Sequence, residues 1–385
     1  MGISKLKFQV IVLIIGASVL SGCSSEGSNT SAKSESQIVN PTGKYIINPQ
    51  FEDSSNFSEG LAAVKSGGKW GYIDKTGAIV VNPQFDSAYS FSEGLALVSL
   101  ALGDDYKWGF IDKTGKFTLN PTFDDAWEMK EGLISIGIKS GSSIKYGYVN
   151  SKGEYVINPQ FDSSYGFSES LASFRVGDYE TGKYGFIDKT GKQVIKAQFD
   201  SANNFVNGYA VVGIKISEKG KDTWKYGAID KTGKYVLNPT YAYVGNFGDG
   251  LFPAQDQGKW GYVDITGKYI VNPQYQSASD FSEGLAAVCT NKPMGENGSS
   301  CGYIDKTGKI IIAEQFPFAG QFFNGQAVVG SGDVDEDYQG RKYGFIDKTG
   351  KISVNPQFSD ANPFYESLAK VTLGYGTNRK TGFIS

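Results

Sequence analysis

One phrase recurs along this chain from residue 69 to its final residues, and it constrains the fold more than any other feature. Its fullest form, Lys-Trp-Gly-Tyr-Ile-Asp-Lys-Thr-Gly, spans residues 69–77, and later copies follow at intervals of 34 to 42 residues. Such self-similarity predicts one supersecondary unit stacked many times, because a single unit cannot bury its own apolar face. The aromatic residue before the glycine is Trp70, Trp108, Tyr146, Tyr184, Tyr226, Trp260 and Tyr343, while Cys301 and Thr381 stand in two equivalent places.

Each copy predicts short β-strands and no helix. The apolar runs are three to five residues long, lack a helical period and are separated by turn residues. Residues 74–77 begin with Asp and end with Gly, which favours a type I turn followed by a bulge. Asn82-Pro83 is expected to end the third strand, because proline cannot donate to the hydrogen-bond ladder. The strands expected in the copy at residues 61–94 are Leu61–Val64, Lys69–Ile73 and Ile79–Val81, with an irregular fourth between residues 84 and 91.

Both faces of these strands carry apolar or very small side chains, which indicates small sheets packed face to face. The repeated Trp and Tyr residues are therefore interpreted as core packing. The alternative is an exposed aromatic ladder that stacks on sugars. The Gly after each aromatic is expected to let the adjoining sheet approach closely. The chain as a whole is predicted to be all-β, built from antiparallel sheets.

The repeated phrases together resemble a known family. Lys-Trp-Gly-Tyr-Ile-Asp-Lys-Thr-Gly, Pro-Gln-Phe-Asp and Phe-Ser-Glu-Gly-Leu-Ala are similar to the WG (KWG) β-repeat of bacterial proteins. The resemblance runs from Thr42 to Ser385, with departures such as Asn150-Ser-Lys-Gly153 and the missing prolines at Ala197 and Glu314. Membership implies an extracytoplasmic or surface repeat protein, and it brings no catalytic residues with it.

The two ends of the repeat region hold complementary parts of one unit. Residues Ile38–Asn48 supply a turn and a third strand, whereas Leu368–Ile384 supply a first and a second strand. Such halves favour a propeller-like closed ring, in which the two termini complete one blade. An open β-repeat superhelix is the alternative, because nine units exceed the usual range of about 4–8 blades. Thr381 would then belong to a polar cap.

The first 37 residues are predicted to lie outside the folded body. Lys5 and Lys7 precede an apolar stretch, residues 8–20, that is too short for a mature membrane span. The sequence Leu20-Ser21-Gly22-Cys23 then resembles the lipobox of bacterial lipoproteins, whose Cys carries the lipid; an ordinary secretory signal is the alternative. The implied organisation is a lipoprotein signal peptide at 1–22, a lipidated flexible tether at 23–37 and a β-repeat array at 38–385. Acyl chains such as palmitate on Cys23 would hold the protein to a membrane of the bacterial cell envelope.

The other two cysteines are expected to form a disulfide. Cys289 ends one strand-like run and Cys301 opens the next, with a Gly/Asn/Ser loop between them. Two strands of one hairpin bring their Cα atoms within disulfide reach, and export to an oxidising compartment favours the bond. Free thiols, or a two-Cys metal site without its other ligands, are the alternatives.

Composition excludes several classes of function. The chain contains no histidine, which removes the commonest general base and the commonest metal ligand. The net charge is −3 and the lysines are spread through the repeats, so the concentrated basic footprint of a nucleic-acid-binding protein is missing. We therefore expect no catalytic residues, no cofactor, no metal and no nucleic-acid partner.

Two sets of repeated carboxylates invite a functional interpretation. A ring of Asp residues could bind cations, but turn chemistry explains them better, because Asp accepts hydrogen bonds from its own turn backbone. The Glu of the Ser-Glu-Gly link is interpreted as shaping or solvating that connection. The turn residues are Asp74, Asp112, Asp188, Asp230, Asp264, Asp305 and Asp347, and the link residues are Glu59, Glu93, Glu131, Glu169, Glu283 and Glu366.

Variation between the copies is concentrated between the first and second expected strands. Those loops should share one rim and form a binding face. The leading hypothesis is an envelope-anchored interaction scaffold that binds a protein or glycan partner through this rim. A cell-wall glycan- or peptidoglycan-active enzyme and a structural envelope protein are the alternatives. The loops are Ser99–Tyr106, Gly177–Gly182, Ile216–Thr223, Asn291–Ser300 and Gly330–Arg341, the last with an acidic cluster at 333–337.

Overall fold

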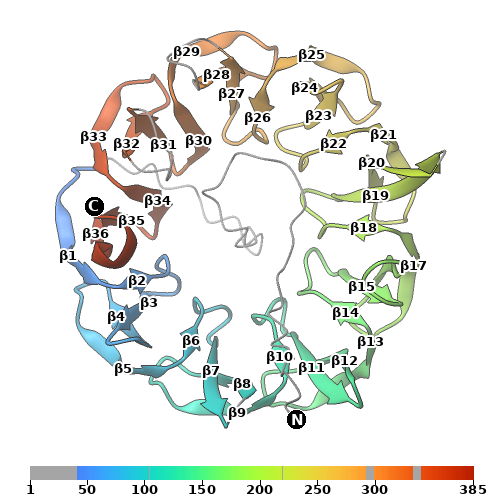
Figure 1. Ribbon diagram of the computed structural model, residues 1–385, viewed down its shortest axis with the longest axis vertical. Coiled ribbons are helices and arrows are strands. Elements are labelled where there is room, and N and C mark those ends of the chain that lie inside the picture. Colours follow the sequence, from blue (N-terminus) through green and yellow to red (C-terminus); the bar gives the residue numbers. More distant parts are fainter. Residues whose placement is uncertain (1–40, 104, 219, 292–298, 333–339) are drawn as a thin grey trace, which may run out of the picture.

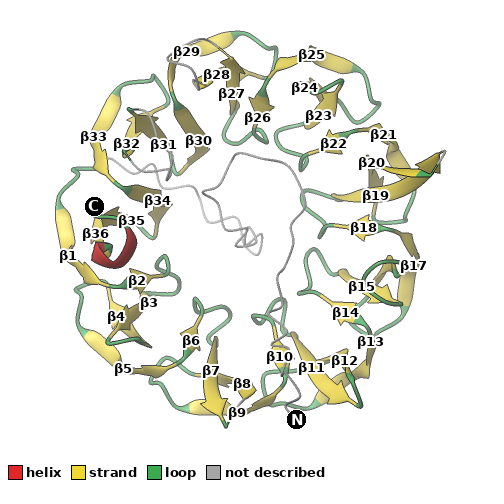
Figure 2. Cartoon of the chain, in the orientation of Figure 1, coloured by secondary structure: helices red, strands yellow, loops and turns green. Residues whose placement is uncertain are grey.

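Nine four-stranded antiparallel sheets form a closed ring (Figure 1). The computed structural model describes residues 41–385 except 104, 219, 292–298 and 333–339. Within these residues there is no α-helix, and one short 3₁₀ turn, η1 (Gly376–Asn378), interrupts the strands (Figure 2). The prediction of an all-β chain of antiparallel sheets is therefore confirmed.

Each sheet forms one blade, and the blades are numbered from the N-terminal side. Blades 1 to 3 are β2 (Asp53–Ser54), β3 (Leu61–Ser66), β4 (Lys69–Asp74), β5 (Ile79–Phe85); β6 (Ser87–Ala88), β7 (Ala96–Leu102), β8 (Asp105–Ile111), β9 (Phe117–Phe123); and β10 (Asp125–Ala126), β11 (Ile134–Ser140), β12 (Ser143–Val149), β13 (Tyr155–Phe161). Blades 4 to 6 are β14 (Ser163–Ser164), β15 (Ala172–Val176), β16 (Lys183–Ile187), β17 (Gln193–Phe199); β18 (Ser201–Ala202), β19 (Tyr209–Glu218), β20 (Lys221–Asp230), β21 (Tyr235–Tyr241); and β22 (Tyr243–Val244), β23 (Phe252–Asp256), β24 (Lys259–Val263), β25 (Tyr269–Tyr275). Blades 7 and 8 are β26 (Ser277–Ala278), β27 (Leu285–Asn291), β28 (Ser299–Asp305), β29 (Ile310–Phe316); and β30 (Phe318–Phe323), β31 (Gln326–Ser331), β32 (Lys342–Asp347), β33 (Ile352–Phe358). The closing blade 9 joins β34 (Asp360–Tyr365), β35 (Leu368–Leu373) and β36 (Lys380–Ile384) to β1 (Tyr45–Phe51).

The innermost strand of most blades is only two residues long (Figure 1). The irregular fourth strand expected between residues 84 and 91 was wrong in extent and in place. Only Ser87–Ala88 pairs as a strand, and it opens the next blade against β7. Two residue pairs, Ser87↔Ser99 and Ala88↔Val98, suffice because the blades on either side hold the inner edge in place.

The outer strand continues through its proline, so the prediction that Asn82-Pro83 ends it was wrong. β5 runs from Ile79 to Phe85, and its register against β4 shifts between the pairs Tyr72↔Val81 and Trp70↔Phe85. The shift is a bulge that contains Asn82 and Pro83. Proline is tolerated there because β5 is the outer edge strand, where an unpaired residue leaves no ladder partner unsatisfied.

The Gly after the repeated aromatic serves this bulge and not the adjoining sheet. A Cβ added at Gly71 would lie 2.4 Å from the carbonyl oxygen of Val81 and 2.6 Å from the nitrogen of Pro83. Both atoms belong to the outer strand of the same blade, which corrects the expectation from the sequence. The equivalent glycines in the other blades meet the same backbone at 2.3–2.7 Å: Gly109, Gly147, Gly185, Gly227, Gly261, Gly302, Gly344 and Gly382.

The ring closes by pairing the two ends of the described chain. β1 pairs antiparallel with β36, in the register Tyr45↔Ile384, Ile47↔Phe383 and Phe51↔Thr381. The N–H groups of Thr42 and Gly43 also donate to the carbonyl oxygen of Ser385 at 2.8 and 2.9 Å. The favoured closed ring is confirmed, and the count of nine sheets did not prevent closure.

The core is distributed between neighbouring blades. At the closing junction, Phe57 and Val64 of blade 1 pack with Phe383 and Ile47 of blade 9, and all four side chains are buried. Eight further clusters of this kind follow around the ring. No blade has a complete core of its own, as expected when each repeat shields its neighbour.

Candidate interaction site

The two faces of the ring carry different kinds of connection. Successive antiparallel strands reverse direction, so connections leave alternate faces. The constant face carries the turn between the first and second strands of each blade and the turn between the third and fourth. The variable face carries the hairpin between the second and third strands, together with the link to the next blade.

The repeated Asp residues lie in turns on the constant face. One Asp74 carboxylate oxygen accepts bonds from the Thr76 N–H at 2.8 Å, the Thr76 hydroxyl at 2.6 Å and the Ala78 N–H at 3.1 Å. These bonds, chiefly the one from the Thr hydroxyl, lower the carboxyl pKa from its ordinary value. The carboxylates of Asp112, Asp188, Asp230, Asp264, Asp305 and Asp347 are bonded in the same way, with lowered pKa values.

The link Glu residues connect neighbouring blades, which the sequence interpretation missed. Glu59 occupies the first central position of a two-residue turn at φ 54°, and its carboxylate accepts the N–H of Gly94 in blade 2 at 3.0 Å. Such a turn favours Asn at this backbone conformation, so a Glu repeated there was the available signal. We call these contacts clasps. The others join Glu93 to Gly132, Glu131 to Ser170, Glu169 to Gly208, Asp249 to Gly284, Glu283 to Gly325 and, across the ring closure, Glu366 to Gly60.

In most junctions the clasp residue matches the neighbouring turn; Glu93 is an exception, because the next turn carries Ser151 at the Lys position. In five junctions the Lys of the next blade's Asp-Lys-Thr-Gly turn pairs with the clasp Glu, for example Lys75 with Glu366 at 2.9 Å. Asn207 replaces Glu where the next turn carries Ile265 in place of Lys. Asn324 replaces it where blade 9 has no such turn, because its third and fourth strands, β36 and β1, are not consecutive in the chain. Both Asn side chains donate instead to a carbonyl oxygen of the next blade, at 2.8 and 3.0 Å.

Loss of one clasp is expected to weaken the ring measurably. In Glu169→Ala the Gly208 N–H and the Lys231 ammonium lose a partner, each at 3.0 Å. The free energy of unfolding should fall by about 1–2 kcal/mol in urea titrations, since both bonds are partly exposed. Ala and Glu are similarly strained at the φ of 52° that residue 169 adopts. The difference in the free energy of unfolding therefore reports the lost contacts of the Glu side chain. Glu180→Ala, on an exposed loop, is the control, and an equal loss there would contradict the clasp.

The repeated aromatic residues are half-buried between blades. Trp70 packs at the edge of the cluster that joins blades 1 and 2, and the other six take the same place at later junctions. Part of each ring reaches the surface on the side of the variable face. The residues concerned are Trp108, Tyr146, Tyr184, Tyr226, Trp260 and Tyr343.

The variable hairpins are more regular than the sequence suggested. Residues 216–223 form mostly strand, because β19 and β20 extend to ten residues each and project beyond the ring. Residues 99–106 are likewise mainly the paired ends of β7 and β8. These two loop expectations were therefore wrong in structure. The acidic cluster at 333–337 and most of the loop from Asn291 to Ser300 lie outside the described residues.

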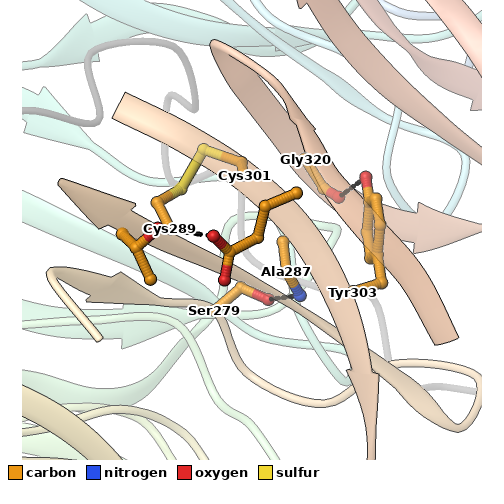
Figure 3. Close-up of a disulfide and its surroundings, with 8 residues drawn as sticks. Ser279, Ala287, Cys289, Cys301, Tyr303 and Gly320 are labelled. Carbon is orange, nitrogen blue, oxygen red and sulfur yellow. Dashed lines mark hydrogen bonds between the residues drawn. A yellow bond between two sulfur atoms is a disulfide. The ribbon is translucent and has the colours of Figure 1, made fainter. Parts of the chain in front are cut away.

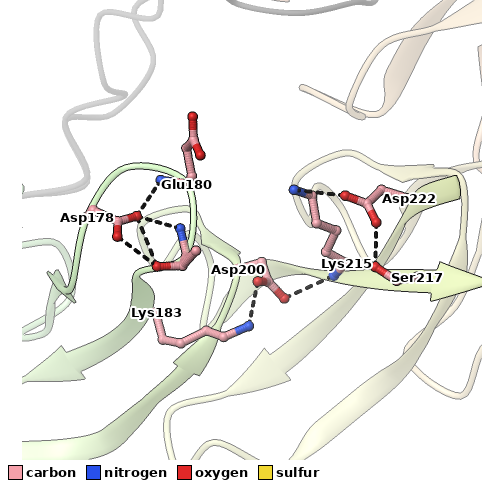
Figure 4. Close-up of polar contacts among 8 residues, drawn as sticks. Asp178, Glu180, Lys183, Asp200, Lys215, Ser217 and Asp222 are labelled. Carbon is pink, nitrogen blue, oxygen red and sulfur yellow. Dashed lines mark hydrogen bonds and ion pairs between the residues drawn. The ribbon is translucent and has the colours of Figure 1, made fainter. Parts of the chain in front are cut away.

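Ion pairs hold the base of several variable hairpins. Lys183 pairs with Asp200, whose second oxygen accepts the Lys215 N–H of the next blade at 3.0 Å (Figure 4). The neighbouring 177–182 loop is organised by Asp178, which accepts the N–H groups of Glu180 and Thr181 (Figure 4). Pairs equivalent to Lys183–Asp200 occur between Lys69 and Asp86, Lys107 and Asp124, and Lys145 and Asp162.

Cys289 and Cys301 are joined in a disulfide between β27 and β28 (Figure 3). They form a cross-strand pair with Cα atoms 4.0 Å apart, and the bond closes the hairpin of blade 7 on the variable face. The residues described contain no group of three or more Cys, Asp or Glu arranged to hold a metal ion. Cys23 lies outside them. In the same part of the chain, no helix has the length and hydropathy needed to cross a membrane.

One carboxyl group has an unusual environment at the inner edge of blade 7. Asp280 accepts the N–H of Asn246 at 2.9 Å and its side-chain amide at 3.2 Å. Burial outweighs these bonds and raises the pKa of Asp280 to about 6 from an ordinary 3.8. The charged form is therefore disfavoured in the folded ring.

This shift predicts a pH-dependent stability. Because the folded pKa is raised, Asp280 contributes stability that is complete below about pH 4 and is lost as pH rises through about 6. Asp280→Asn should stabilise the ring at pH 7.5 by about 1–3 kcal/mol and flatten the slope between pH 4 and 6. Urea titrations across this range, with the exposed Asp256→Asn as control, measure the effect. An unchanged slope in Asp280→Asn would contradict the assignment.

The fold and the inter-blade junctions define a nine-bladed β-propeller. The profile of the WG containing repeat matches nine segments, at 38–70, 70–100, 108–138, 146–179, 184–215, 226–260, 260–292, 302–333 and 343–375. The chain belongs to this family.

Solved structures share the fold at low sequence identity. A eukaryotic initiation factor aligns with a TM-score of 0.55 and 11% identity, over 83% of this chain and 91% of that chain. A puromycin hydrolase aligns with a TM-score of 0.35 and 10% identity, over 71% and 53% of the two chains. A prolyl endopeptidase gives 0.41 and 13%, over 78% and 53%. The first likeness shows the fold alone, and the other two have no bearing on catalysis. The search among curated proteins found no match.

Proposed function

We propose that this protein is a non-catalytic scaffold, lipid-anchored at the bacterial cell envelope through Cys23, that binds a protein or glycan partner on its variable face. The proposal is supported by the difference between the two faces, one with repeated turns and the other with hairpins of different lengths. The constant face repeats the same turns and uses their Asp and Glu carboxylates in backbone bonds within and between blades. The hairpins of the variable face differ in length from blade to blade, and such loops on a rigid scaffold commonly bind partners.

A photo-cross-linking amino acid placed on each face tests the binding surface. Lys221 lies exposed near the tip of the β19–β20 hairpin on the variable face, and Lys116 lies exposed beside a turn of the constant face. In the full chain expressed in cells, the photo-cross-linking residue at 221 should give one saturable cross-linked product, and the one at 116 should not. Equal labelling from both positions, or from neither, would refute binding on the variable face.

Loss of the lipid-accepting thiol tests the anchor. Cys23→Ser should move the protein from the membrane pellet to the soluble fraction, because stable attachment depends on acyl chains. Cys289 and Cys301 cannot replace it as lipid acceptors, since their sulfur atoms are joined in a disulfide. Retention of the variant in the membrane pellet would remove lipidation from the proposal.

A further inference from the structure

We propose that the junction of blades 5 and 6 on the variable face is a carbohydrate-binding site, in which a row of aromatic rings receives a chain of sugar residues. The row comprises Trp224 and Tyr226 of β20, Tyr243 of β22 and Trp260 of β24. The inference rests on the proposed function, because it names the class of partner that the variable face takes.

The four rings are nearly parallel. Successive ring centroids lie 6.0, 5.5 and 6.4 Å apart, with interplanar angles of 18°, 17° and 26°. Parallel rings at these separations are displaced sideways, so each covers only part of the next. Trp224 is 38% exposed, and the other three rings are half-buried. The row therefore offers a stepped aromatic surface to solvent.

Two members of the row, Tyr243 and Trp224, differ from the residues that other blades carry at the equivalent positions. Tyr243 opens the inner strand of blade 6, where seven other blades carry Ser or Asp. Trp224 lies on the extension of β19 and β20, which reaches farther than any other hairpin within the described residues. Neither ring is needed to build a blade. Together they join the repeated Tyr226 and Trp260 into one continuous row.

Polar groups are placed among the rings. Gln255 is the cross-strand partner of both Tyr243 and Trp260, so its amide lies on the same side of the sheet between them. At the other end, the Lys215 ammonium lies over the Trp224 ring at 5.9 Å and pairs with Asp222 at 3.2 Å (Figure 4).

This junction also lacks an acid that other junctions have. In four blades, the Lys directly before the repeated aromatic residue pairs with an Asp in the link to the next blade. In blade 5 the corresponding Lys is Lys225, and the position of the Asp is occupied by Ala242. Across the parts of the chain that are described, Lys225 forms no ion pair. Its ammonium is left as a donor for a hydroxyl or carboxylate group of a ligand.

These features fit a sugar chain better than a protein surface. A pyranose ring has a face of C–H groups that can lie on an aromatic ring, and its hydroxyl groups can bond to amides and ammonium groups at the rim. The core of a protein interface needs a broad apolar patch with few charges. Here the aromatic row is narrow, and the ion pair of Lys215 with Asp222 lies at its Trp224 end.

The test uses the full chain, purified in detergent, on an array of neutral, amino-sugar and uronic-acid oligosaccharides. Titration calorimetry then gives the affinity for the best binder. Tyr243→Ser restores the residue of other blades, and Trp224→Thr changes an exposed side chain, so both variants should keep the wild-type melting temperature. Each should weaken binding at least about tenfold, as expected when one stacked ring is lost. Tyr106→Ser, an exposed aromatic on the hairpin of blade 2, should bind as the wild type does.

Two results would overturn the site. One is the absence of any oligosaccharide binding by the wild-type chain, and the other is unchanged binding by the double variant Tyr243→Ser with Trp224→Thr. If either occurs while the photo-cross-linking residue at 221 still gives its product, the scaffold function stands and only the carbohydrate site fails. A product that protease treatment degrades would identify the partner of the variable face as a protein.

Discussion

Removal of residues 1–51 is expected to lower the melting temperature of the whole ring by about 10 °C or more relative to a variant that lacks only residues 1–40. The longer deletion takes away β1, the outer strand of blade 9. It uncovers the paired edge of β36 and removes the buried side chains of Ile47 and Phe51 from the closing cluster. Loss of two such side chains alone costs about 4 kcal/mol or more.

The effect should spread beyond one blade, because the cores lie between blades. Opening the ring also deprives the Glu366–Gly60 clasp and the Lys75–Glu366 pair of a fixed geometry. Calorimetry of both deletion variants is the measurement, and neither contains residues 1–40, so their comparison isolates residues 41–51, which comprise β1 and the Thr42 and Gly43 bonds to Ser385. A low-temperature transition confined to blade 9, with the main transition unmoved, would show that the remaining eight blades do not depend on closure.

Much of this architecture could be predicted from the phase of the repeat. The chain enters with the last strand of a unit and leaves with the strands before it, so pairing of the ends completes a ninth sheet. The number of aromatic-glycine positions gave the number of blades. Turn types were also accessible, because Asp74 and Gly77 specify a turn whose Gly takes φ 87°.

Other features depend on contacts that periodicity does not contain. The inner strand, such as the two-residue β6, is too short to show an alternating pattern. Pro83 indicates the end of a strand unless it is known that β5 is the outer edge strand of its blade. The role of Glu59 requires the position of Gly94, 35 residues later, in the neighbouring blade. The sequence alone shows each Glu only within its own link, so the contact with the next blade could not be predicted from it.

The candidate site shows the same limit. The sequence placed the variable hairpins on one rim, and antiparallel pairing explains why this follows from equivalent positions in each unit. The aromatic row could not be predicted, because Tyr226 and Tyr243 belong to different blades and meet only across the junction. A signal existed in Tyr243 and Ala242, which both depart from the repeat at positions that are usually polar.

Gly71→Ala is expected to destabilise the ring by about 3 kcal/mol or more, although it adds a single methyl group. The new Cβ would lie 2.4 Å from the Val81 carbonyl oxygen and 2.6 Å from the Pro83 nitrogen. Neither atom can move as a side chain does, because both belong to a strand held by the register Trp70↔Phe85 and Tyr72↔Val81.

Gly320→Ala is the matched control for this change. There the nearest atom to an added Cβ lies at 3.4 Å, and the backbone conformation is open to any residue, so the expected loss is below about 1 kcal/mol. Urea unfolding of both variants measures the difference. Similar losses would mean that the bulge on the outer strand yields easily, and the repeated glycine would then need a cause other than the close approach of the backbone. A large loss in Gly71→Ala alone would make the glycine after each aromatic a requirement of the blade itself, independent of what the variable face binds.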